Sequence, residues 1–142
     1  MRLEAALAPG CTYYPVDLIA RDHRTTVADL NKTVPPLYGD VAVALGLLEY
    51  ILDVPRFLRE VATRATRGVF SYHPLDRNTK RDRLAMAWVN ALNTSELHAL
   101  LAWAGYRKIR VIEIGKKGTS QLLFVGDSAR CTFTRPTSAN RP

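Results

Sequence analysis

The run DVAVALGLL, residues 40–48, restricts the fold of this 142-residue chain more than any other stretch. It is almost entirely apolar, so a strand formed by it would be buried on both faces, as in parallel sheets packed between helices. A helical pattern follows at once, because Asp53 can cap a helix and Pro55 suits its first turn. Apolar residues from Phe57 to Ala65 then recur at helical spacing. A buried strand leading into such a helix predicts an α/β fold with a mostly parallel sheet.

Further predicted strands and helices surround this unit. Strands are predicted over residues 11–18, 25–30, 67–74, 106–114 and 119–126, and helices over 82–91 and from Asn93 or Thr94 to Ala104, with the last turns of a helix over 2–8. Prolines make 32–39 a loop, and GKKG between the last two strands predicts a hairpin. The result is one domain over 1–126, followed by a polar tail over 127–142 that we expect to be disordered.

Charge and cysteine content narrow the function classes. The net charge is +7, but the basic residues are spread along the chain, so nucleic-acid binding is not favoured. No apolar run reaches the length of a membrane span, and the first ten residues are a poor signal peptide because Glu4 interrupts a short apolar stretch. Cys11 and Cys131 match no metal-binding spacing, which favours two unpaired thiols in a reducing cytoplasm. We therefore expect a cytoplasmic protein with no membrane contact and no metal.

Several motifs occur in a characteristic order. Asp17 ends one strand-like run, VADLN (27–31) ends the next, DVAVALGLLEYILDVPRFLREV spans 40–61, and LxxLLxxAGY spans 97–106 before the terminal hairpin. Together they resemble class I S-adenosylmethionine-dependent methyltransferases, over residues 2–126. The resemblance implies a Rossmann-like sheet with helices on its faces and a C-terminal antiparallel hairpin. It also implies S-adenosylmethionine as cofactor and methyl transfer to a small-molecule acceptor.

The resemblance assigns cofactor-binding roles to five residues. Asp17 matches the acidic residue that accepts hydrogen bonds from the ribose hydroxyls, and a carboxylate suits a vicinal diol because charge-assisted bonds are strong. Asp29 and the Leu30 backbone match the adenine side, whereas Leu45 and Gly46 match the methionine side. Ligands of open α/β sheets bind at the carboxyl ends of strands, so Asp17 and Asp29 should converge at one lip of a parallel sheet. The alternative is that both aspartates are only turn residues.

Candidate catalytic residues end the strand predicted over 67–74. Methyl transfer needs a positioned nucleophile and sometimes a base, and the sequence SYHP presents Tyr72 and His73 on the cofactor side. His73 is the candidate general base. The alternative is a histidine held by backbone hydrogen bonds with no chemical role. No metal cluster, phosphate loop or Ser-His-Asp order points to another reaction.

One family feature is missing from the sequence. Family members begin with a strand and a glycine-rich turn of GxGxG type, and this chain contains no GxG. The first central strand, between those ending at Asp17 and Leu45, is therefore expected to be missing, with cofactor binding weakened or lost. The chain would then be a truncated version of a longer enzyme, which we favour. Alternatively, the two neighbouring strands would pair directly, or another chain, including a second copy, would supply a strand.

Three functions stay open from the sequence. The first is methyl transfer to a small molecule by a domain impaired in this form. The second is a non-catalytic methyltransferase-like remnant that binds a partner or forms a homo-oligomer through its incomplete sheet. The third is a basic nucleic-acid-binding module, which the dispersed charge makes the least favoured.

Overall fold

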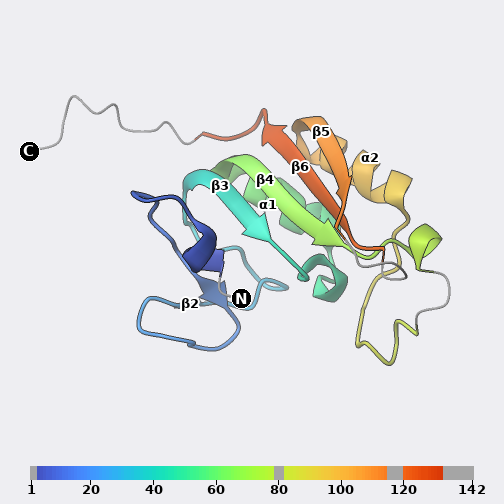
Figure 1. Ribbon diagram of the computed structural model, residues 1–142, viewed down its shortest axis with the longest axis horizontal. Helices are drawn as coiled ribbons and strands as arrows, with labels where there is room; N and C mark the ends of the chain where they lie inside the picture. The colour runs from blue at the N-terminus through green and yellow to red at the C-terminus, as the bar shows by residue number, and fades with distance from the viewer. Residues whose placement is uncertain (1–2, 79–81, 115–119, 133–142) are drawn as a thin grey trace, which may run out of the picture.

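A four-stranded sheet forms the centre of the protein (Figure 1). The computed structural model describes residues 3–78, 82–114 and 120–132. In spatial order the strands are β3 (Gly39–Ala44), β4 (Ala65–Tyr72), β6 (Leu122–Ser128) and β5 (Tyr106–Glu113). Strand β3 is parallel to β4, and β6 is antiparallel to both β4 and β5, so β6 alone runs against the other three. The predicted mostly parallel sheet with a C-terminal antiparallel pair is confirmed, although the GKKG segment lies outside the described residues.

Helix α1 (Val54–Arg64) begins where the sequence predicted. The Asp53 side chain accepts a hydrogen bond from the Arg56 amide (2.9 Å), and Pro55 occupies the first turn. Both signals act within the first turn. The Asp53 side chain pairs a backbone N–H that has no partner inside the helix, and Pro55 occupies a position whose N–H would make no helical hydrogen bond.

Helix α2 (Thr94–Ala104) also has the predicted ends. The Asn93 side chain accepts from the Glu96 amide and the Glu96 carboxylate accepts from the Asn93 amide, which makes a capping box. Gly105 ends the helix at φ +106°, a left-handed conformation that glycine adopts without steric cost. Within the described ranges, no helix is both long and apolar enough to cross a membrane.

Both helices pack on one face of the sheet (Figure 1). The core between them includes Phe70, Tyr72, Leu122 and Phe124 from the strands, Phe57, Leu58 and Val61 from α1, and Leu97 and Leu101 from α2. The opposite face has no helix over it among the described residues. There Val41 and Val43 are 50% and 39% exposed. The prediction that residues 40–48 are buried on both faces is therefore wrong, because the described residues supply cover for only one face.

A second, smaller sheet precedes the main one. It consists of β1 (Val16–Asp17) and β2 (Thr26–Val27), which are parallel. Both strands are shorter than the predicted 11–18 and 25–30, and the helical end predicted over 2–8 is a single 3-10 turn, η1 (Leu3–Ala6). Strand β1 pairs with β2 and not with β3, so direct pairing of the strands that end near Asp17 and Leu45 does not occur. The two sheets are separate.

Polar contacts join the small sheet to the main body. After β2, the Asn31 side chain donates to the Tyr50 carbonyl (3.0 Å) and accepts from the Leu52 amide (2.7 Å). The Leu30 carbonyl accepts from Arg56 (2.8 Å). Tyr50 belongs to the 3-10 turn η2 (Leu48–Tyr50), which follows β3. The link therefore consists of side-chain hydrogen bonds and of Leu30 packed against the core, and it includes no strand ladder.

The prediction of a helix over residues 82–91 is wrong. This segment is an irregular loop in which Ala87 has a left-handed φ of +55°. Isolated turns pair some of its amides, such as the Trp88 amide with the Arg83 carbonyl (2.9 Å). Tertiary contacts hold the next two residues, since the Val89 amide donates to the Glu49 carbonyl and the Asn90 side chain donates to the Leu48 and Ile51 carbonyls. Tertiary partners of this kind override helix propensity.

Residues 127–132, which the sequence predicts as the start of the tail, continue the described fold. Strand β6 continues to Ser128, the Ala129 amide donates to the Gly105 carbonyl (2.9 Å), and the Thr132 amide donates to the Thr63 carbonyl (3.3 Å). The rest of the tail predicted over 127–142 lies outside the described residues.

Replacing Asn31 with alanine should loosen the small sheet. The change removes one donor and one acceptor that join it to η2, each worth about 1 kcal/mol. Hydrogen exchange followed by mass spectrometry should show faster exchange over residues 16–30, with exchange in β4 and β6 unchanged. The variant Asn31→Asp, which keeps the acceptor for Leu52, should fall between wild type and alanine. Equal protection in all three proteins would contradict this account of the link.

Candidate functional site

Residues from both sheets meet at one rim of the protein. Strands β3 and β4 are parallel, so the segments that follow their carboxyl ends lie at the same end of the main sheet. The segment after β2 joins this rim, because Asn31 is bonded to residues that follow β3. This is the end of a parallel sheet at which ligands bind in open α/β folds. We call it the carboxyl rim.

Asp17 lies at the carboxyl end of β1. Its Oδ2 accepts from Arg21 Nε (2.9 Å) and its Oδ1 from the Ile19 amide (3.3 Å). The Arg21 hydrogen bond, helped by the Ile19 amide, holds the pKa of the Asp17 carboxyl below its ordinary value, so the group is charged at neutral pH. Arg21 is largely exposed, and exposed ion pairs are weak. A ligand hydroxyl can therefore compete for this carboxylate.

Asp29 follows β2 at the same edge of the small sheet as Asp17, since β1 and β2 are parallel and in register. Its Oδ1 accepts from the Asn31 amide (3.1 Å), and Lys32 lies 3.4 Å from Oδ2. The backbone of Asp29 also closes a turn by accepting from two later amides. The structure thus brings both aspartates to one lip, and Asp29 serves a turn there as well.

Leu45 and Gly46 follow β3 at the carboxyl rim. Leu45 is exposed, and Gly46 has a left-handed φ of +62°. The Gly46 amide donates to Ser71 Oγ (2.8 Å), which ties this turn to β4. A side chain at Gly46 would meet no other atom within 4 Å, so the surface beside this turn is open to a ligand.

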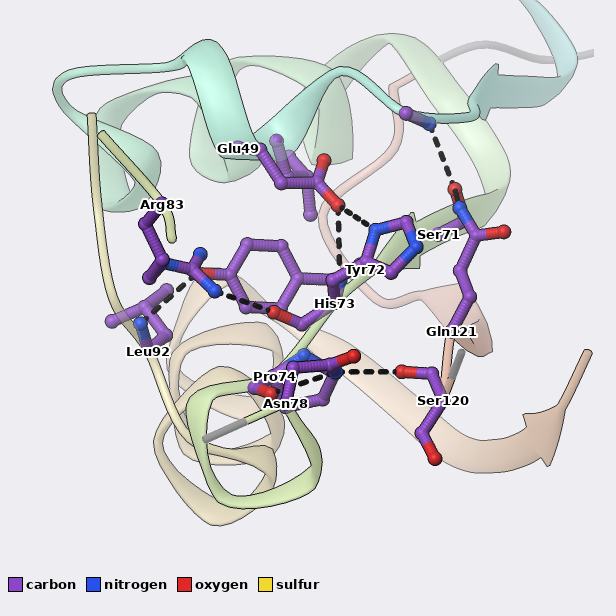
Figure 2. A network of polar contacts seen from close by, with 12 residues as sticks. Glu49, Ser71, Tyr72, His73, Pro74, Asn78, Arg83, Leu92, Ser120 and Gln121 are labelled. Carbon is purple, nitrogen blue, oxygen red and sulfur yellow. Dashed lines mark hydrogen bonds and ion pairs between the residues drawn. The ribbon is translucent and has the colours of Figure 1, made fainter. Parts of the chain in front are cut away.

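His73 is held by a buried carboxylate (Figure 2). Glu49 is 1% exposed, and its Oε1 accepts from both the His73 amide (2.9 Å) and His73 Nδ1 (2.8 Å). This contact places Nδ1 against a carboxylate oxygen and leaves Nε2 as the ring nitrogen for which the described structure shows no hydrogen bond. The other Glu49 oxygen, Oε2, is buried without a partner in the described structure. An unpaired buried carboxylate oxygen costs free energy, and a catalytic role is one of the explanations for such a group in a native protein.

Trp88 fixes the histidine ring from a second direction. The two rings stack with centroids 4.9 Å apart, and the guanidinium of Arg83 lies 4.7 Å from the Trp88 ring. Arg83 also donates to the His73 carbonyl (3.0 Å). The imidazole is therefore oriented by a hydrogen bond and a stack, as a positioned base requires.

Tyr72 has the contacts of a structural residue. It is fully buried, and its hydroxyl donates to Asn90 Oδ1 (2.5 Å) while accepting from Arg83 (2.9 Å) and the Leu92 amide (3.0 Å). Burial raises its pKa above the ordinary value, so it stays protonated. A hydroxyl in this state has no capacity left for a substrate. Tyr72 therefore anchors the 82–92 loop, and these contacts occupy the hydroxyl that the predicted catalytic role would need.

The sequence interpretation missed the Glu49–His73 pair. One signal was present: Glu49 is the single charge in the apolar run LGLLEYIL, and a charge in such a run needs a buried partner. His73 is 24 positions away, and no spacing rule connects the two. Among the described residues, no cluster of three or more metal-ligating side chains occurs, and Cys11 and Cys131 form no disulfide with each other.

Comparison with known proteins identifies the fold. No family model and no curated protein sequence matches the chain. Among solved structures, an S-adenosylmethionine-dependent methyltransferase from Mesorhizobium loti is similar to this chain, with a TM-score of 0.61 at 20% identity. The match covers 79% of this chain and 78% of the Mesorhizobium loti chain. The magnesium protoporphyrin IX methyltransferase of Synechocystis PCC 6803, crystallised with SAH, matches at a TM-score of 0.56 and 13% identity. The N-terminal domain of EvdMO1, with SAH and D-fucose, matches at 0.58 and 19%.

These matches confirm a class I methyltransferase-like fold. They cover 74% and 73% of this chain for the Synechocystis enzyme and the EvdMO1 domain. The chain spans about half of each of those two proteins, 51% and 54%.

Replacing Tyr72 with phenylalanine should reduce stability. The change leaves the Leu92 amide, Arg83 and Asn90 without their shared partner, and a buried polar group left unpaired costs about 1–3 kcal/mol. Urea unfolding followed by circular dichroism should show that loss. The control Tyr50→Phe removes a hydroxyl from an exposed tyrosine and should change little. A Tyr72→Phe protein as stable as wild type would refute the anchoring role.

Proposed function

We propose that this chain is a methyltransferase-type domain that binds S-adenosylmethionine at the carboxyl rim and serves methyl transfer to a small-molecule acceptor. The observation that carries the proposal is the placement of Asp17 and Asp29 at one lip of two parallel strands, within a class I methyltransferase-like fold. Structural neighbours crystallised with SAH support the choice of ligand.

The residues at the rim suit the parts of this cofactor. Asp17 would accept hydrogen bonds from the ribose diol through its charged, partly exposed carboxylate. Asp29 and the Leu30 backbone would lie on the adenine side. Leu45 and the open turn at Gly46 would lie on the methionine side, where the absence of a side chain lets a ligand approach the backbone. Bound S-adenosylmethionine supplies an electrophilic methyl group.

His73 is the proposed general base. Its Nε2 lone pair would take the proton from an acceptor hydroxyl or amine, and Glu49 would stabilise the imidazolium that forms, because its carboxylate already holds Nδ1. Trp88 would keep the ring in place during this transfer. Glu49 is a positioning residue in this scheme.

We further propose that cofactor binding by this chain is weak. No glycine-rich turn occurs among the described residues of the rim, and β1 and β3 belong to separate sheets. Part of the binding energy would therefore be spent on ordering the small sheet against the main body. The second candidate function is that of a non-catalytic methyltransferase-like remnant, which would bind a partner or form a homo-oligomer. The separation of the two sheets also favours this candidate.

Calorimetric titration with S-adenosylhomocysteine tests the cofactor site. We expect saturable binding of the wild-type chain and at least about tenfold weaker binding of Asp17→Ala, which loses charge-assisted bonds worth about 1.5–3 kcal/mol each. Asp40→Ala, at the amino end of β3, removes a carboxylate far from the rim and should bind normally. A folded wild-type chain that releases no heat with millimolar ligand would favour the remnant.

The position of His73 can be tested without knowing the acceptor. The chain has three histidines, and their ring protons can be assigned by single substitution. S-adenosylhomocysteine should shift the His73 ring resonances, because His73 follows β4 at the carboxyl rim, and should leave His98, on α2, unmoved. Binding without any shift at His73 would remove this residue from the proposed site.

A further inference from the structure

We propose that the face of the main sheet opposite α1 and α2 docks an amphipathic helix with acidic flanks from a partner protein. We call it the open face. The site is independent of the cofactor site, because it lies on a different surface and is argued from different residues.

The open face is apolar across its width. Strand registers place Val43, Val69 and Val125 side by side on β3, β4 and β6, pointing away from the helices. The same face carries Val41, Leu123 and Ile112, and of these six residues Val41, Val43 and Ile112 are the most exposed. Contiguous exposed apolar surface of this kind marks interaction sites.

The dimensions of the row suit a helix. Neighbouring strands lie about 4.8 Å apart, so the three valines span about 10 Å, which is close to the diameter of an α-helix. Sheets with mostly parallel strands are usually covered by helices on both faces. In Figure 1 this face is turned to the viewer, with α1 and α2 behind it.

Cations border the apolar row. A groove of about 480 Å³ is lined by Arg67, Lys108, Arg110, Val125 and Asp127, among others. Arg67 is neutralised by Asp127 (2.8 Å). Lys108 and Arg110 have no acidic partner in the described part of the chain. An apolar strip beside unpaired cations is complementary to an apolar helix stripe flanked by carboxylates.

A second groove of about 390 Å³ extends the surface across β3 and β4. It is lined by Asp40, Val41, Thr66, Arg67 and Asp127. Both grooves lie toward the amino ends of β3 and β4, away from the carboxyl rim that holds Asp17 and His73. The two grooves share no lining residue with the proposed cofactor site.

The charges and residue types argue against two other occupants. A second copy would bring Arg110 and Lys108 of both chains into one interface, and the net charge of +7 adds to that repulsion. Single-stranded nucleic acid is bound by aromatic residues that stack on bases, and the open face presents valines, a leucine and an isoleucine instead.

Fluorescence anisotropy with two designed peptides tests the proposal. The probe is a fluorescein-labelled helix of about 16 residues, or about 24 Å, with leucines on one stripe and glutamates on both flanks; its partner peptide carries lysine at each glutamate. We expect saturable binding of the acidic peptide only. Arg110→Glu should weaken it about fivefold and improve binding of the lysine peptide. Val43→Glu, at an exposed position, should abolish binding while circular dichroism shows an intact fold.

Arg77→Glu is the matched control, because it makes the same charge change on an exposed residue of η3 (Leu75–Arg77), beside α2. It should bind the acidic peptide as wild type does. The proposal is overturned if neither peptide binds at millimolar concentration, or if both bind equally. It is also overturned if sedimentation shows a dimer that Val43→Glu dissociates, or if a DNA oligonucleotide binds and Arg110→Glu abolishes that binding.

Discussion

The packing of α1 and α2 against a single face of the β3–β4–β6–β5 sheet is the constraint on which the rest of the structure depends. Phe70 and Phe124 point into this layer and are buried completely. Gly68 makes the packing possible, because a Cβ there would come within 2.3 Å of the Phe70 ring. The layer sets the register of β4 and β6, and through β4 it sets where His73 leaves the sheet. It also determines which face is left open.

Strand direction separates the two proposed sites. The segments that follow β3 and β4 turn at the carboxyl rim, where Gly46 bonds to Ser71 and His73 bonds to Glu49. The cations of the open face lie toward the other end, around Arg67. A change at one end would reach the other only through the sheet itself. Cofactor binding at the carboxyl rim and peptide binding at the open face can therefore be tested independently, and loss of one does not imply loss of the other.

Local signals in the sequence were sufficient for the helices and insufficient for the site. Asp53, Asn93 and Gly105 act through neighbouring backbone groups, so α1 and α2 could be predicted with their ends. The helix prediction for residues 82–91 was wrong because polar groups of this segment bond to residues far away in sequence, as Asn90 does to Leu48. The Glu49–His73 pair has the same character. Residues 40–48 encode apolar faces, but a hydrophobic pattern does not say which segment, or which molecule, will cover each face.

The link between the two sheets decides what the carboxyl rim can do. Asp17 and Asp29 belong to the small sheet, whereas Gly46 and His73 belong to the main one. The two parts are joined by the side-chain bonds of Asn31 and Arg56 and by Leu30 packed on the core, with no shared ladder. A ligand that spans the rim would add contacts to both parts and hold them together, since anything that binds only the joined state stabilises it. Under the proposed function, the free energy of holding the two parts together would be drawn from the binding free energy, so a change that strengthened the link between β1 and the main sheet would raise affinity without touching the ligand.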